Sequence, residues 1–125
     1  MVAAKPSLYQ FAYWVGITGL SDYANQECAC FVPNTWTHVA GVFDADAHTL
    51  SFYRNGELTG STATTQNIRA GSSTLYFGRW GNDDTRRFIG DLDDFVIYNR
   101  VLVLAEIQRL AREKVPISGT TATAP

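Results

Sequence analysis

Three residues near the middle of the chain, Trp36, His38 and Asp44, are of types that could form a catalytic group. A histidine can act as general base for a nucleophile, and a nearby acid can orient it. The nucleophile would have to be a serine or cysteine within hydrogen-bond reach, and nothing in the sequence marks such a set. We therefore interpret His38 as a hydrogen-bonded structural histidine, and His48, in a polar turn, as solvated.

A second group of polar and aromatic residues fills the stretch RWGNDDTRR, residues 79–87. Sugars stack on aromatic rings while planar polar groups hold their hydroxyls, and calcium prefers clustered carboxylate and amide oxygens. The stretch therefore predicts a ligand-binding loop. The candidate glycan-binding residues are Trp80, Asn82 and Arg86, and the candidate calcium ligands are Asn82, Asp83 and Asp84. Because calcium needs about six to eight oxygens, an ordinary Asn-Asp surface turn is the simpler interpretation.

Aromatic residues also gather near the start of the chain, where most are expected to pack in the core or at a sheet edge. Trp14 and Tyr23 are further candidates for lining a glycan groove or a subunit contact. Two cysteines, Cys28 and Cys30, are too close in sequence for a mutual disulfide and too few for a metal site. We interpret them as free, partly buried thiols.

Length and composition narrow the functional classes. A chain of 125 residues with 46% hydrophobic and 13% aromatic residues fits one globular domain. Its net charge of −2, without a basic block, argues against nucleic-acid binding. No apolar run reaches membrane-spanning length, and the first residues, MVAAKPSLYQ, lack the apolar core of a signal peptide. The sequence predicts a soluble domain whose compartment it does not assign.

Strand patterns dominate the chain and predict an all-β antiparallel sandwich with one short C-terminal helix. The side chains of residues 35–43 alternate between two faces that both look substantially buried, which predicts an inner strand of a sandwich. Further along, Asn55-Gly56 is a strong signal for a β-hairpin turn. The other expected strands cover residues 8–17, 27–32, 49–58, 74–80 and 86–98, the last with a bulge at Asp93-Asp94. Residues 101–114 have helical periodicity, with Glu106 expected to meet Arg109 or Leu110. The domain is thus predicted over residues 7–113, and residues 114–125 as a flexible tail or linker.

The order of these patterns resembles the laminin-G-like and pentraxin-like jelly rolls of the concanavalin A-like lectin/glucanase superfamily. The resemblance implies a noncatalytic carbohydrate-binding or adhesion module that contacts a glycan or glycoprotein through rim loops. The charge and hydropathy given above add that we expect neither nucleic-acid binding nor membrane insertion. The resemblance also implies an extracellular or cell-surface location, and it assigns possible calcium ligation to the Asn82 to Asp84 run. The matching residues are Trp36, His38, Val39, Ala40, Asp44, Leu50, Tyr53, Asn55, Gly56, Gly78, Gly90, Asp93, Ile97, Tyr98, Asn99, Arg100, Leu102, Glu106 and Ile107.

The chain departs from this family pattern in two places. Family members usually carry several strands before the point that corresponds to the start of this chain, so we expect an uncovered sheet edge and a homo-oligomer formed through it. A structural or assembly module that self-associates is therefore the alternative function. At the helix start, Val103 stands where the family has a capping serine, and Asn99 or another upstream group is expected to cap instead.

Glycosidase chemistry is the third and least favoured alternative. The glucanase branch uses acidic residues that alternate along one strand, and Asp91 and Asp93 have that spacing, ~6.5–7 Å along a strand. The third position of the alternation is Phe95, so the acidic set is incomplete. We expect no enzymatic activity, and we expect Asp93 to bond a nearby backbone amide instead.

Overall fold

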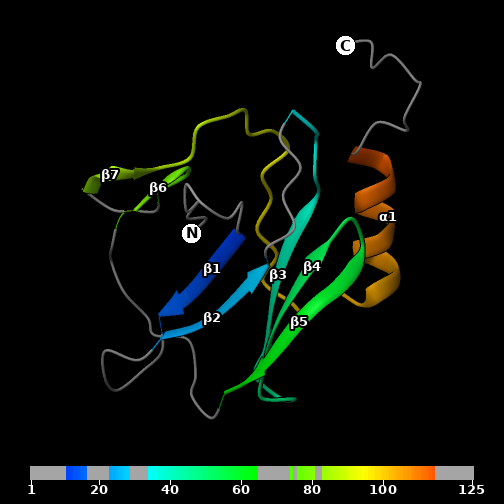
Figure 1. Cartoon of the computed structure of the whole chain (residues 1–125). Helices are drawn as coiled ribbons and strands as arrows, with labels where there is room; N and C mark the ends of the chain where they lie inside the picture. Colours follow the sequence, from blue (N-terminus) through cyan, green and yellow to red (C-terminus); the bar gives the residue numbers. More distant parts are fainter. Residues whose placement is uncertain are drawn as a thin grey trace.

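The computed structural model describes residues 11–16, 23–28, 34–64, 74, 76–80 and 83–114. In this part of the chain all the strands pair antiparallel and a single helix follows them (Figure 1). The elements are β1 (Phe11–Gly16), β2 (Tyr23–Cys28), β3 (Val39–Asp44), β4 (Thr49–Arg54), β5 (Glu57–Ala63), β6 (Arg79–Trp80), β7 (Asp83–Arg87) and α1 (Leu104–Lys114). An antiparallel three-stranded sheet with one short helix is consistent with the predicted β-sandwich.

The central sheet has the order β3-β4-β5 and is built from two consecutive hairpins. In the first turn, the Asp44 carboxylate accepts hydrogen bonds from the backbone N–H groups of Asp46 and Ala47, at 3.0 and 2.8 Å. The second turn is the predicted Asn55-Gly56, where both residues have positive φ, 49° and 82°, as a type I′ turn requires. Among the strands that the structure describes, β4 is the inner one and β3 pairs with β4 alone, so within this part of the chain the prediction that residues 35–43 form an inner strand is wrong.

The β1–β2 hairpin confirms the first predicted strand in its central part. The second strand of the hairpin, β2, begins at Tyr23, four residues before the predicted start at Glu27, and ends at Cys28. Residues 29–33, including Cys30, lie outside the described residues. Strand β2 approaches β4 and β5, which brings the hairpin against the central sheet (Figure 1).

The two strands predicted last are much shorter than expected. Strand β6 contains only Arg79–Trp80, and β7 ends at Arg87, so residues 88–98 are not a strand and hold no bulge. Asp94 has a positive φ of 52°, which interrupts an extended backbone. A strand forms only where a neighbour accepts its backbone hydrogen bonds, and alternation along one segment cannot show whether that neighbour exists.

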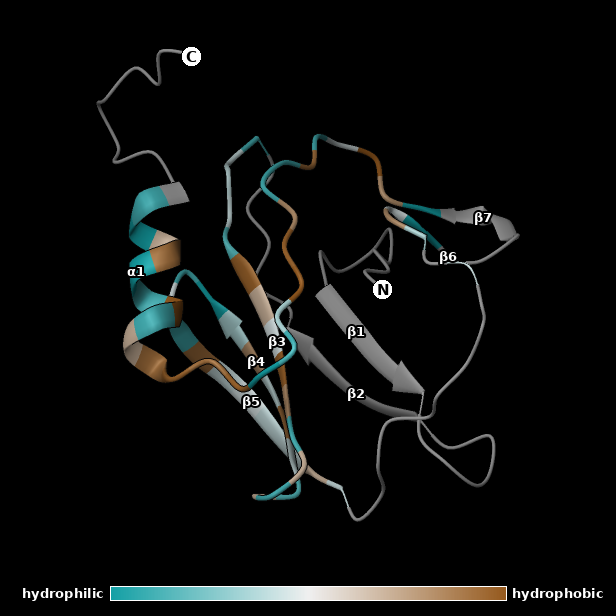
Figure 2. Ribbon diagram, turned by 180° about the vertical axis from the view of Figure 1, so that it is seen from behind, coloured by the Kyte–Doolittle hydropathy of each residue, from teal (hydrophilic) through white to brown (hydrophobic). Residues whose placement is uncertain are grey.

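Helix α1 covers the end of the sheet where β4 turns into β5 (Figures 1 and 2). The apolar face predicted for it is confirmed at Ile107 and Ala111, which are buried, whereas Val103 is 60% exposed. On the sheet, Leu50 and Phe52 of β4 are buried. Within the described residues, no helix is both long and apolar enough to cross a membrane.

The first turn of α1 is held by Glu106. Its carboxylate accepts a hydrogen bond from the Val103 backbone N–H at 3.0 Å and a bidentate pair from Arg100 at 2.7 and 2.8 Å. These bonds lower the pKa of Glu106 to about 2. The ion pair of Glu106 is with Arg100, which we did not expect, and Arg109 contributes a weaker electrostatic effect that also lowers the pKa of Glu106. Arg109 itself approaches Glu113 at 3.8 Å. The group that caps the start of α1 is the carboxylate of Glu106, which lies downstream of Val103, so the expected cap by Asn99 or another upstream group is wrong.

This arrangement is half of a capping box, and it predicts a stabilising substitution. The Val103 carbonyl accepts the first helical hydrogen bonds, from Glu106 and Ile107, so Val103 is the N-cap residue. A serine hydroxyl there can accept the Glu106 N–H and complete the box. We expect Val103→Ser to raise the free energy of unfolding by about 0.5–2 kcal/mol in urea titrations. The control is Val103→Ala, which removes the same branched side chain without adding an acceptor; an equal gain from both variants would contradict this explanation.

Candidate functional site

The predicted ligand-binding loop is an antiparallel hairpin in the structure. Trp80 of β6 pairs with Asp83 of β7, and Arg79 pairs with Arg87. Asp83, Asp84 and Arg86 therefore belong to a strand and not to a loop, while Asn82, in the connection, lies outside the described residues. The hairpin brings Trp80 and Asp83 together as cross-strand neighbours at its tip.

Three contacts lie at the base of this hairpin, and the second and third of them join it to the segment that follows. The guanidinium of Arg79 lies 5.0 Å from the ring centroid of Tyr76, a cation–π distance. The Phe88 backbone N–H donates to the Gly78 carbonyl at 2.7 Å. The rings of Phe77 and Phe95 meet edge to face, with centroids 4.0 Å apart and planes at 69°. The base of the hairpin is thus an aromatic and cationic surface.

Our sequence analysis missed the three residues at this base, Tyr76, Phe77 and Arg79. A signal for them was present, because an aromatic residue three positions before an arginine is a pattern that can bring ring and guanidinium together. We had taken residues 74–80 as one continuous strand, in which Tyr76 and Arg79 would face opposite sides.

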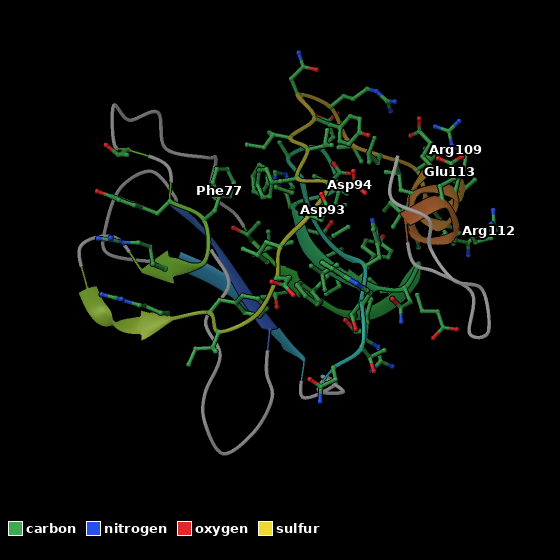
Figure 3. The ribbon with its side chains drawn as sticks, turned by 90° about the horizontal axis from the view of Figure 1, so that it is seen from above. Phe77, Asp93, Asp94, Arg109, Arg112 and Glu113 are labelled. Atoms are coloured by element: carbon green, nitrogen blue, oxygen red, sulfur yellow. The ribbon has the colours of Figure 1, made fainter. Side chains whose placement is uncertain are left out.

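The carboxylates beyond the hairpin do not form a catalytic row. Asp93 accepts a hydrogen bond from the Asp94 backbone N–H at 2.7 Å, which confirms its expected role toward a backbone amide. Because Asp94 adopts positive φ, Asp91, Asp93 and Phe95 do not follow the regular alternation that would align three groups on one strand. Figure 3 shows Asp93 and Asp94 between Phe77 and helix α1. Across the side chains that the structure describes, no three His, Cys, Asp or Glu residues converge as a metal site would require.

His38 is built into the sheet through its backbone. Its N–H donates to the Asn55 side-chain oxygen at 2.9 Å, and its carbonyl accepts the Asn55 N–H at 2.8 Å. The ring Nδ1 is buried and has no hydrogen-bond partner among the described residues, so within them the prediction of a hydrogen-bonded ring is wrong for this nitrogen. Burial lowers the pKa of His38, which favours the neutral imidazole. His48 is exposed, as expected.

The two upstream candidates lie on the β1–β2 hairpin. Trp14 pairs with Asn25, and Tyr23 pairs with Gly16, so they occupy different strands of one ladder. Their side chains are outside the described part of the structure, and their role in a glycan groove stays a prediction.

Comparison with known proteins assigns the family. The family described as the concanavalin A-like lectin/glucanases superfamily matches residues 4–108, most of the chain. The chain belongs to this superfamily. The resemblance that we drew from the order of motifs is therefore confirmed, and the match extends upstream of Trp36 into the β1–β2 hairpin of this superfamily member.

One solved structure similar to this superfamily member is the 2.1 Å crystal structure of residues 221–444 of an S-layer domain-containing protein from Clostridium thermocellum ATCC 27405. The two share 24% sequence identity with a TM-score of 0.59, which shows likeness of fold alone. The alignment covers 82% of this chain and 52% of that one, so the chain spans about half of the solved structure. The search of curated proteins finds no match.

Proposed function

We propose that this chain is a lectin-like jelly-roll domain without catalytic activity, which binds glycans at the β6–β7 hairpin. The observation that carries the proposal is the backbone pairing of Trp80 with Asp83. Cross-strand partners lie on one face of a ladder, about 4.5–5.5 Å apart. An aromatic plane beside a carboxylate is the combination that stacks a sugar ring and accepts hydrogen bonds from its hydroxyls.

The same hairpin argues against calcium as the main ligand. Only three candidate oxygen-bearing residues stand together in this segment, Asn82, Asp83 and Asp84, whereas calcium needs about six to eight oxygens. The proposed saccharide contact therefore does not depend on calcium, and Asn82, Asp83 and Asp84 are not needed together.

The arrangement of the carboxylates supports the proposed absence of catalytic activity. A retaining glycosidase needs two carboxyl groups about 5–5.5 Å apart in fixed register, and Asp93 is engaged with the Asp94 backbone in a segment that is not a strand. We place the domain at an extracellular or cell-surface location. The superfamily membership supports this proposal, and so does the description of the similar solved structure as an S-layer domain-containing protein.

A glycan array tests the proposal. We expect the wild-type chain to give saccharide signals, and Trp80→Ala to weaken them about tenfold or more, the loss typical of a buried aromatic anchor. Trp36→Ala is the matched control, because Trp36 is also a tryptophan, is 49% exposed, and belongs to the segment before β3 and not to the hairpin.

Far-UV circular dichroism on both variants shows whether each remains folded. Absence of any saccharide signal from the wild type, or equal losses for the two tryptophan variants, would overturn glycan binding at the hairpin. Turnover of a β-glucan that Asp93→Asn abolishes would instead overturn the noncatalytic assignment.

A further inference from the structure

The segment between β7 and α1 exposes an unusual amount of apolar surface. Between residues 88 and 104, nine large apolar side chains have exposed fractions from 41% to 95%. They are Ile89, Leu92, Phe95, Val96, Ile97, Tyr98, Val101, Val103 and Leu104. Contiguous apolar surface of this kind marks an interaction site in a folded protein.

Residues 95–98, with the sequence FVIY, are the centre of this surface. These four consecutive residues are 63%, 60%, 68% and 41% exposed, so side chains that point to either face of the segment reach solvent. All four are β-branched or aromatic, the types that favour paired strands. In the part of the chain that the structure describes, no strand pairs with them. A segment with these properties is an acceptor for another strand.

We infer that residues 95–98 pair antiparallel with the same residues of a second copy of this chain, across a twofold axis between Val96 and Ile97. This register sets Phe95 opposite Tyr98 and Val96 opposite Ile97. Aromatic and β-branched cross-strand pairs of this kind stabilise antiparallel ladders, and a twofold axis closes the contact as a dimer.

The charges at the two ends of residues 95–98 favour a second copy of the chain as the partner and an antiparallel orientation of the pair. Asp93 and Asp94 precede the apolar residues, and Arg100 follows them. An antiparallel twofold pair therefore brings the acidic end of each copy beside the arginine of the other, whereas a parallel pair would set like charges together. The Arg100 side chain is 55% exposed, and its guanidinium has five N–H donors, so its bonds to Glu106 leave donors for a second carboxylate. The left-handed backbone at Asp94 ends the regular ladder, which limits it to the four apolar residues.

The first test is the mass of the full chain in solution. We expect light scattering after size exclusion to give a dimer at micromolar concentration, and Ile97→Asp to give a monomer with unchanged circular dichroism. Ile89→Asp is the control, because Ile89 is 95% exposed but lies outside the proposed pair, and it should stay dimeric. A monomeric wild type would overturn the inference and leave a strand from another polypeptide segment as the occupant. A dimer that survives Ile97→Asp, or an assembly larger than two copies, would also overturn it.

A cross-link tests the register without relying on the fold of the aspartate variant. Opposed residues of an antiparallel pair have Cα atoms about 4.5–5.5 Å apart, within the range of a disulfide. An equimolar mixture of Val96→Cys and Ile97→Cys chains should form a covalent dimer under mild oxidation. The wild type, which already contains Cys28 and Cys30, should form much less. Equal yields from the mixture and the wild type would contradict the proposed register.

Discussion

Replacing Leu50 with alanine is expected to lower the free energy of unfolding by about 2–5 kcal/mol. Leu50 lies on the inner strand β4 and is fully buried, at 0% exposure. The truncation removes apolar contacts and leaves a cavity. Strand β4 is paired on both sides, so its backbone cannot shift to fill that cavity. Domains of this size are stable by only about 5–15 kcal/mol, so the loss should be visible in both the urea midpoint and the melting temperature.

Leu58→Ala is the matched control for this prediction. Leu58 lies on the neighbouring strand β5, but its side chain is 55% exposed. The same atoms are removed from a site in contact with water, and we expect a change within about 0.5 kcal/mol. Similar losses for Leu50→Ala and Leu58→Ala would contradict the assignment of the core to the inner strand.

The position of Leu50 also explains why the apolar surface after β7 matters. In the described part of the chain, the fully or nearly buried apolar residues come from β4 and α1, while larger apolar side chains lie exposed between β7 and α1. Association through residues 95–98 would add burial that the described core lacks.

The parts of the fold that sequence analysis predicted correctly are those specified by nearby residues. The β4–β5 hairpin follows from Asn55-Gly56, because these residue types adopt positive φ at low cost. Helix α1 follows from apolar spacing over one continuous segment. Residues 88–98 have an equally clear β composition, but whether they form a strand depends on a partner far away in sequence or on another chain. Composition alone could not supply that information.

The local structure of the candidate site differs from the one that the sequence predicts, and its role as a site stays a prediction. We expected a loop over residues 79–87, because Gly81 and the polar run that follows it are typical of turns. The structure continues β7 through Asp83 and Asp84, since Trp80 and Arg79 supply partners for their strand.

The second large effect is expected at Gly56. In this residue of the β4–β5 turn φ is +82°, a left-handed conformation that costs a residue with a Cβ atom about 1–2 kcal/mol. An added Cβ would also lie 3.0 Å from the backbone Cα of Gln108 and 3.5 Å from the Ala111 side chain, both in α1. The helix therefore has to move away from the turn, or the turn has to change type.

We expect Gly56→Ala to destabilise the chain by about 2–5 kcal/mol, the sum of the backbone strain and an overpacking cost of about 1–3 kcal/mol. Urea titration followed by far-UV circular dichroism measures the loss. Gly41→Ala is the control: Gly41 is exposed in β3 and is not among the residues with positive φ, so alanine there should change stability by no more than about 0.5 kcal/mol. Because the clash involves the helix backbone, shortening Gln108 to alanine in the Gly56→Ala background should restore little stability. Full recovery in that double variant would mean that only the Gln108 side chain, 3.2 Å away at Cγ, opposes the added methyl group.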